Sequence, residues 1–81
     1  MNKTWYVYLL ECNDGSYYTG VTIDVDERIA THKAGKGSKY VAQKGVKKLL
    51  RAKPYLTKSD AYKEEYRIKQ LPRQQKIFAF D

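Results

Sequence analysis

Side chains that could bind an anion and move a proton lie close together in the first half of the chain. Arg28 and the only histidine, His32, are four residues apart, so on a helix both side chains reach the same region of space. Tyr18 lies upstream of them, and a phenol with a pKa of about 10 acts as a base at pH 7 only beside another base or a cation. A single histidine or tyrosine is more often a packing residue. The combination of the three groups therefore indicates a candidate site, and no one of them does so alone.

A later segment carries two neighbouring acids that could hold a metal ion. Glu64 and Glu65 lie in a predicted helix whose apolar side is defined by Ala61, Ile68 and Leu71. Glu64 lies among these residues and Glu65 lies at their border, so the periodicity does not choose between the two acids. A carboxylate near a buried face needs a cation, and either a metal ion or a neighbouring lysine would supply it.

Two runs of β-branched and aromatic residues, before and after residues 13–15, predict a β-hairpin. A two-residue loop would turn Tyr18 away from the face of Tyr8, whereas a three-residue loop that ends on a left-handed glycine pairs Gly20 with Tyr8. We favour the three-residue loop because residues 13–15, Asn-Asp-Gly, have a glycine at its third position. Glycine within a strand marks a place where another group comes close. Four residues then share one face: Tyr6, Tyr8, Tyr18 and Gly20.

The segments after the hairpin predict helices and one further strand. Asp24 can cap a helix that spans residues 25–33, with Glu27 three residues later and Gly35 beyond its end. The remaining predictions are, in order, a glycine- and lysine-rich loop over 34–45, a strand over 46–53 before Pro54, a helix from a cap at Thr57 or Ser59 to Gln70, and a short helix that starts near Pro72. The fold class is therefore α+β: a small three-stranded antiparallel sheet flanked by helices, in the order β-β-α-β-α-α.

Length and composition narrow the function classes. A chain of 81 residues predicts one domain over 1–81, because a chain this short cannot divide its core. The net charge of +7 and the pI of about 9.5 favour a polyanionic partner, nucleic acid first, although many small basic proteins bind no polyanion. Cys12 is the only cysteine, which excludes a disulfide within the chain and fits a reducing compartment. No apolar run is long enough to span a membrane, so we expect a cytoplasmic protein.

At these positions the chain resembles the GIY-YIG nuclease domain, and in particular its small stand-alone bacterial members, the UPF0213-like proteins. The sequence YVY at 6–8 stands where the family has GIY, and YTG at 18–20 stands where it has YIG. Arg28 follows the tyrosine of the second motif by ten residues, and His32 follows by four more. The family's acid lies on a later helix, and the sequence EYRIKQL aligns it with Glu65. The resemblance covers nearly the whole chain.

The resemblance implies a metal-dependent endonuclease that hydrolyses phosphodiester bonds in DNA with little intrinsic sequence specificity. It implies five roles, namely a general base (Tyr8), a residue that positions the phosphate or water (Tyr18), a phosphate clamp (Arg28), a proton relay (His32) and a ligand for Mg²⁺ or Mn²⁺ (Glu65). Beside this site, Lys36 and Lys39 could follow neighbouring phosphates and Tyr40 could stack on a base. We expect a monomer with no membrane partner, and a protein partner where specificity is needed.

Two other functions fit the same residues. The first is a nucleic-acid-binding module that has the fold without turnover, or that needs a partner protein. The second is a protein-interaction domain whose tyrosine face docks an acidic partner. Turnover separates the nuclease from the module, whereas binding that survives Arg28→Ala, without affinity for nucleic acid, would indicate the interaction domain.

Overall fold

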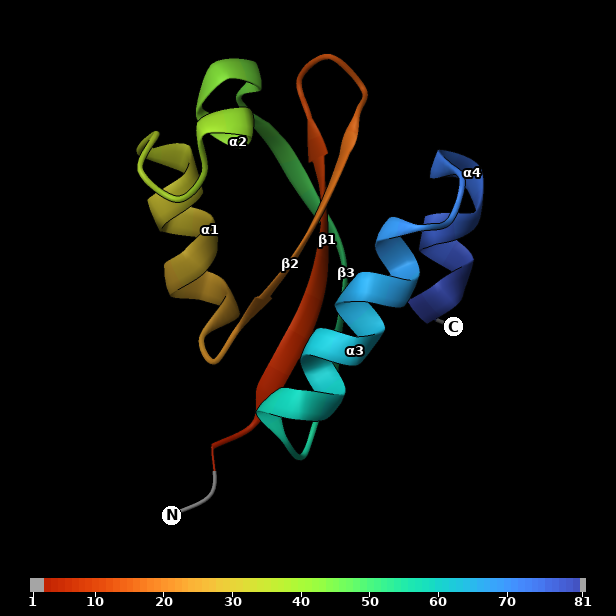
Figure 1. Ribbon diagram of the computed structural model, residues 1–81. Coiled ribbons are helices and arrows are strands. Elements are labelled where there is room, and N and C mark those ends of the chain that lie inside the picture. Colours follow the sequence, from red (N-terminus) through yellow and green to blue (C-terminus); the bar gives the residue numbers. More distant parts are fainter. Residues whose placement is uncertain (1–2, 81) are drawn as a thin grey trace.

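The computed structural model describes residues 3–80, and its three strands form one antiparallel sheet in the order β2-β1-β3 (Figure 1). The elements follow the chain as β1 (Trp5–Cys12), β2 (Tyr17–Thr22), α1 (Val25–Lys33), α2 (Lys39–Lys44), β3 (Val46–Tyr55), α3 (Lys58–Lys69), α4 (Arg73–Lys76) and the 3₁₀ helix η1 (Ile77–Phe80). The predicted α+β class with three antiparallel strands is confirmed. Within residues 3–80 no helix has the length and apolarity that a membrane span requires.

The hairpin has the register that the three-residue loop predicts. Tyr8 of β1 pairs with Gly20 of β2. The backbone N–H of Cys12 donates to the carbonyl oxygen of Ser16 at 2.8 Å, which closes the loop over residues 13–15. Gly15 has a φ of 85°, a left-handed conformation that side chains other than that of glycine rarely adopt. The turn sequence therefore sets which side chains of β1 and β2 face one another.

Side chains of β1 alternate between the two faces of the sheet, and each face has its own apolar cluster. The cluster beside α1 and α2 comprises Tyr8, Leu10, Cys12 and Val41. The cluster beside α3 comprises Val7, Ala61 and Ile68. Figure 1 shows the same division, with α1 and α2 on one side of the strands and α3 and α4 on the other. The sheet therefore lies between two helical layers.

The two longer helices begin at caps that the sequence carries. Asp24 accepts a hydrogen bond from the backbone N–H of Glu27 at 3.0 Å, so α1 starts where predicted. Thr57 accepts one from the backbone N–H of Asp60 at 3.1 Å, which makes Thr57, and not Ser59, the cap of α3. Both caps satisfy N–H groups that have no partner within the helix.

Two local predictions are wrong. The segment 34–45 is not all loop, because Lys39–Lys44 forms α2. The side chain of Val41 is fully buried in the core, and packing of this kind stabilises a helix too short to form by propensity alone. The third strand does not stop before Pro54 but continues to Tyr55. β3 is an edge strand, where a proline without an N–H is tolerated.

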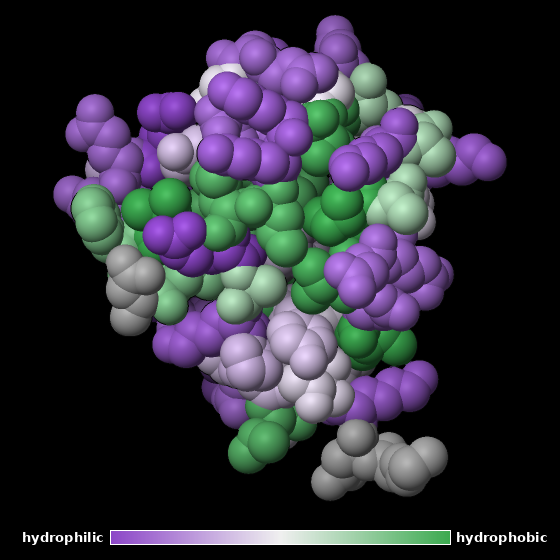
Figure 2. All heavy atoms as spheres, turned by 180° about the vertical axis from the view of Figure 1, so that it is seen from behind, coloured by the Kyte–Doolittle hydropathy of each residue, from purple (hydrophilic) through white to green (hydrophobic). Residues whose placement is uncertain are grey.

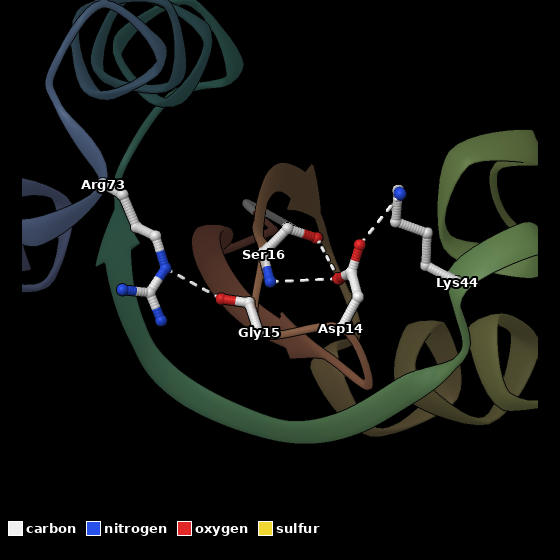
Figure 3. Close-up of polar contacts among 5 residues, drawn as sticks. All are labelled: Asp14, Gly15, Ser16, Lys44 and Arg73. Carbon is white, nitrogen blue, oxygen red and sulfur yellow. Dashed lines mark hydrogen bonds and ion pairs between the residues drawn. The ribbon is translucent and has the colours of Figure 1, made fainter.

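The tip of the β1–β2 hairpin is connected to α2 by an ion pair and to α4 by a hydrogen bond (Figure 3). Asp14 accepts hydrogen bonds from the backbone N–H and the hydroxyl of Ser16, at 3.0 and 2.6 Å, and pairs with Lys44 of α2 at 2.8 Å. On the opposite side, Arg73 Nε donates to the carbonyl oxygen of Gly15 at 2.8 Å. Lys44 and Ser16 hold the pKa of the Asp14 carboxyl well below its usual range. The start of β2 is therefore anchored to both helical layers.

Candidate active site

The side chain of Tyr8 crosses from β1 over β2 to reach α1. A Cβ atom added to Gly20, its partner on β2, would come within 2.5 Å of Tyr8 Cζ and 2.9 Å of Cε1. The hydroxyl oxygen of Tyr8 lies 2.9 Å from Nε2 of His32. The close approach that a glycine within a strand predicts is therefore present, and the absent side chain of Gly20 leaves the space that the phenol occupies.

Gly20→Ala should lower the free energy of unfolding by about 1–3 kcal/mol, the usual cost of overpacking a filled site. The added methyl group overlaps the phenol of Tyr8 and cannot move away, because it is fixed to the backbone. Urea denaturation measures the loss. In a Tyr8→Leu background the overlapping atoms are gone, so the same change should cost less. An equal cost in both backgrounds would show that the methyl group does not meet Tyr8.

Helix α1 brings Arg28 and His32 to the Tyr8 hydroxyl, as their spacing predicts. His32 is only 2% exposed, and a Cβ atom on Gly37 would lie 2.6 Å from its Nδ1. Nη2 of Arg28 donates to the carbonyl oxygen of Gly37 at 3.4 Å. Gly37 therefore positions both side chains. It was not identified from the sequence, where the only signal is a second glycine close behind the one that follows α1.

Burial keeps Tyr8 and His32 neutral near pH 7. It raises the pKa of the Tyr8 phenol, and the Arg28 guanidinium beside the hydroxyl offsets only part of this rise. It lowers the pKa of the His32 imidazole, and the charge of Arg28 lowers that pKa further. The hydrogen bond between the Tyr8 hydroxyl and Nε2 of His32 can form with either tautomer of the ring, and which atom donates depends on that tautomer. Nδ1 of the same ring is buried and has no hydrogen-bond partner among residues 3–80.

The protein should lose stability as the pH falls below 6.5, the ordinary pKa of histidine. The folded state holds the pKa of His32 below that value, so protonation favours the unfolded chain. The stability from this group is complete above pH 6.5 and is lost on acidification. Urea denaturation from about pH 5 to about pH 7.5 measures the slope, at pH values above those where carboxyl groups titrate. The slope should flatten in His32→Gln, and an unchanged slope would assign it to another group.

Tyr18 and Tyr40 extend the site toward the surface. The Tyr18 ring is edge-on to the His32 imidazole, with 5.4 Å between ring centroids. The Tyr18 ring also stacks with that of Tyr40, with 6.3 Å between centroids and 22° between ring planes. Lys36 is exposed on the segment between α1 and α2, and Lys39 is exposed at the start of α2. The structure thus brings Tyr40 next to Tyr18 and leaves the two lysines at the surface.

The two glutamates of α3 affect the pKa values of different tyrosines. Glu64 accepts hydrogen bonds from Arg67 at 2.5 and 3.1 Å, and adds to burial in raising the pKa of Tyr55. Glu65 instead adds to burial in raising the pKa of Tyr8. Tyr8 lies in the cluster beside α1, on the other face of the sheet from α3. Of the two acids, Glu65 is the one whose charge contributes to the Tyr8 pKa, and Glu64 is the one whose charge contributes to the Tyr55 pKa.

A divalent ion at this place would have one protein carboxylate. Among residues 3–80 no three His, Cys, Asp or Glu side chains gather closely enough to form a metal cluster. The side chain of Glu65 is 17% exposed and pairs with Lys69 at 3.5 Å, a long ion pair that a divalent ion could replace. Proteins commonly hold Mg²⁺ through one or two carboxylates, with waters and substrate phosphate oxygens as the other ligands. The oxygen donor at Glu65 fits such an ion.

Comparison with known proteins identifies the family. The family model of the GIY-YIG catalytic domain matches residues 4–77. The chain belongs to the GIY-YIG family. GIY-YIG domains are nuclease domains that act on nucleic acid and generally use divalent metal ions. The resemblance inferred from the sequence is therefore confirmed, and nuclease-type activity follows from it at this level of detail.

Relatives within the GIY-YIG family are UPF0213 proteins. One from Oceanobacillus iheyensis is 47% identical, with 95% of this chain and 90% of that protein covered. Another, from Halobacterium salinarum, is 49% identical over 93% of this chain and 97% of that protein. The solution NMR structure of a UPF0213 protein from Bacillus halodurans is 46% identical, covers 90% of this chain and 78% of that chain, and superposes with a TM-score of 0.56. The GIY-YIG fold described above is shared with that structure.

Proposed function

We propose that this chain is a divalent-metal-dependent endonuclease that hydrolyses phosphodiester bonds in DNA with little intrinsic sequence preference. The observation that carries the proposal is the hydrogen bond of 2.9 Å between Tyr8 Oη and His32 Nε2, formed inside a GIY-YIG domain. A buried phenol bonded to a neutral imidazole is arranged for proton transfer. Arg28 beside them is arranged to bind an anion.

In the proposed mechanism, Tyr8 takes the proton from the attacking water. Its own proton passes along the hydrogen bond to Nε2 of His32 as the water proton arrives. The lowered pKa of His32 keeps its ring neutral and able to accept this proton. The raised pKa of Tyr8 keeps the phenol protonated until the water is in place. Burial of both groups thus suits a relay in which neither residue is charged at rest.

Arg28 would bind the non-bridging oxygens of the scissile phosphate. Its Nε is buried and has no hydrogen-bond partner in the part of the chain that the structure describes, and its Nη2 makes a long hydrogen bond of 3.4 Å to Gly37. A phosphate would give these donors the anionic acceptor that they lack. Tyr18, whose ring is edge-on to His32, would orient the phosphate or the water.

Glu65 would be the ligand for Mg²⁺ or Mn²⁺, with waters and a substrate phosphate oxygen as the other ligands. When bound, the ion supplies positive charge that stabilises the departing oxygen. To accept it, the Glu65 carboxylate would leave Lys69, which is 3.5 Å away. A single carboxylate holds such ions weakly, so we expect substrate and ion to bind together.

Exposed groups around the site would hold DNA through its backbone. Lys36 and Lys39 would contact phosphates, and Tyr40, which is 42% exposed, would stack on a base. Neither kind of contact reads base edges, which accounts for the weak sequence preference. The net charge of +7 makes this binding sensitive to salt. We expect the nuclease to act as a monomer and a partner protein to supply specificity.

Cleavage of labelled DNA with and without Mn²⁺ tests the proposal, and the two acids of α3 give a matched pair of variants. Glu65→Gln should abolish the Mn²⁺-dependent rate. Glu64→Gln, which weakens only the pair with Arg67, should cut normally. Line broadening by Mn²⁺ in NMR spectra locates the ion without an activity assay, and should centre on Glu65 and vanish in Glu65→Gln.

Two results would contradict this function. Equal effects of the two glutamine substitutions would remove Glu65 from its role as metal ligand. Binding without cleavage on branched, nicked and single-stranded DNA alike, in the unaltered chain with Mn²⁺, would make the protein a nucleic-acid-binding module.

A further inference from the structure

Among residues 3–80, no strand pairs with the outer edge of β3. The sheet order is β2-β1-β3, so β3 pairs with β1 on one side only. β3 is ten residues long, but its pairing with β1 skips Lys47 and Leu50, so its outward-pointing backbone N–H and C=O groups alternate regularly only between these two positions and beyond them. The carbonyl oxygen of Leu50 accepts a hydrogen bond from the Arg51 side chain at 2.8 Å. Pro54 has no N–H, so another strand could pair only with the stretches of residues 46–53 that the two irregularities leave.

β3 is strongly basic. It carries no acidic residue and four basic ones: Lys47, Lys48, Arg51 and Lys53. Lys47 has a side chain 57% exposed and lies 3.7 Å from Glu11, a distance too long for a strong ion pair. Lys33 of α1 lies beside the same surface as Lys47 and Lys48. Lys33, Lys47 and Lys48 outnumber Glu11 and Asp26 at this surface, so this part of β3 favours acidic groups.

Two hollows lie between α1 and β3, next to this edge. The first hollow has a volume of about 460 Å³. Its lining includes the apolar side chains of Ile29 and Leu49 and four charged ones: Asp26, Lys33, Lys47 and Lys48. The second, of about 390 Å³, is lined by Tyr6, Ile23, Val25 and Ala52 together with Asp24 and Asp26, so its occupant would be an apolar side chain and not an acidic one. Leu49 is 38% exposed and Ile23 is 42% exposed. Figure 2 shows the molecule from behind, with apolar side chains gathered at the centre of the view and hydrophilic ones around them.

We propose that an extended acidic segment of a partner protein docks on β3 as a fourth strand of the sheet. An added strand lies about 4.8 Å from its neighbour, and its alternate side chains point to the same face. Apolar side chains of the partner would enter the two hollows, while acidic ones would meet Lys33, Lys47 and Lys48. Main-chain hydrogen bonds would supply affinity, and the hollows would supply specificity.

Two other binding partners, a second copy of this chain and nucleic acid, would fit the β3 edge less well. A second copy of β3 would set lysine against lysine, so the charge that attracts an acidic strand also opposes self-association. Nucleic acid would use the lysines but neither the outward backbone groups nor the apolar hollows. β2, which carries Tyr18, forms the opposite edge of the sheet, so a segment on β3 would leave that edge uncovered.

NMR spectra of the full ¹⁵N-labelled chain test the proposal with a synthetic peptide of alternating glutamate and valine, acetylated and amidated at its ends. We expect amide shifts along residues 46–53 and slowed hydrogen exchange of the outward-facing amides. Lys48→Glu should weaken peptide binding by about tenfold or more, because like charges then oppose each other. The same reversal at Lys63, exposed on α3, should leave it unchanged.

Control ligands separate strand addition from simple charge attraction. A peptide N-methylated at alternate amides should bind weakly, because it cannot pair with β3. The proposal is overturned if the glutamate peptide causes no shifts on β3, or if a peptide with lysine in place of glutamate binds equally well. Shifts confined to Tyr8 and Arg28 would also overturn it, as would a DNA oligomer that displaces the peptide from β3.

Discussion

Tyr8→Phe should lower the rate of DNA cleavage by about 100- to 10,000-fold, the usual contribution of a general base. The substitution removes only the hydroxyl that lies 2.9 Å from His32 Nε2. Arg28 and the exposed lysines remain, so binding of DNA should change little and the loss should appear in kcat. Single-turnover cleavage and fluorescence anisotropy measure the two effects separately.

Tyr55→Phe is the matched control for this variant. It removes a hydroxyl from a tyrosine that packs on the other face of the sheet, so it should cut at the unaltered rate. Tyr8→Phe also leaves His32 Nε2 buried without its partner, at a cost of about 1–3 kcal/mol, so circular dichroism must show that the variant is folded. A folded Tyr8→Phe protein with normal kcat would exclude Tyr8 as the base.

Arg28→Ala should lower kcat/KM by about 100- to 1,000-fold, the loss typical of removing one donor to a transition-state anion. The side chain has an unpartnered buried Nε and a second donor held by Gly37, and alanine removes both. Arg28→Lys keeps the positive charge without the planar fork, so it should recover only part of the activity. Cleavage of the same labelled DNA under subsaturating conditions measures all three proteins.

Lys63→Ala is the control for loss of charge alone. Lys63 is exposed on α3, and its removal lowers the net charge of +7 by the same amount as Arg28→Ala. It should reduce cleavage only slightly. If Arg28→Ala and Lys63→Ala reduced cleavage by the same factor, Arg28 would contribute through overall charge and would not be the phosphate clamp.

Much of the geometry around Tyr8 is determined by residues close together in the chain. The turn at residues 13–15 pairs Tyr8 with Gly20, and the left-handed glycine at its third position favours that loop. Asp24 starts α1 by capping it, and the spacing of four residues places Arg28 and His32 on one side of the helix. Each of these features depends on backbone angles and hydrogen bonds within a few residues, so the sequence by itself predicts them.

The tertiary structure decided the remaining features. Glu64 and Glu65 have the same chemistry and adjacent positions, and only the packing of α3 against the sheet decides that the charge of Glu65 contributes to the Tyr8 pKa and that of Glu64 to the Tyr55 pKa. Burial of Val41 turns part of an apparent loop into α2, and the path of the chain between α1 and α2 brings Gly37 against His32. Contacts between distant segments depend on how the whole core packs. No short stretch of sequence contains that information, which is why these features appear only in the folded chain.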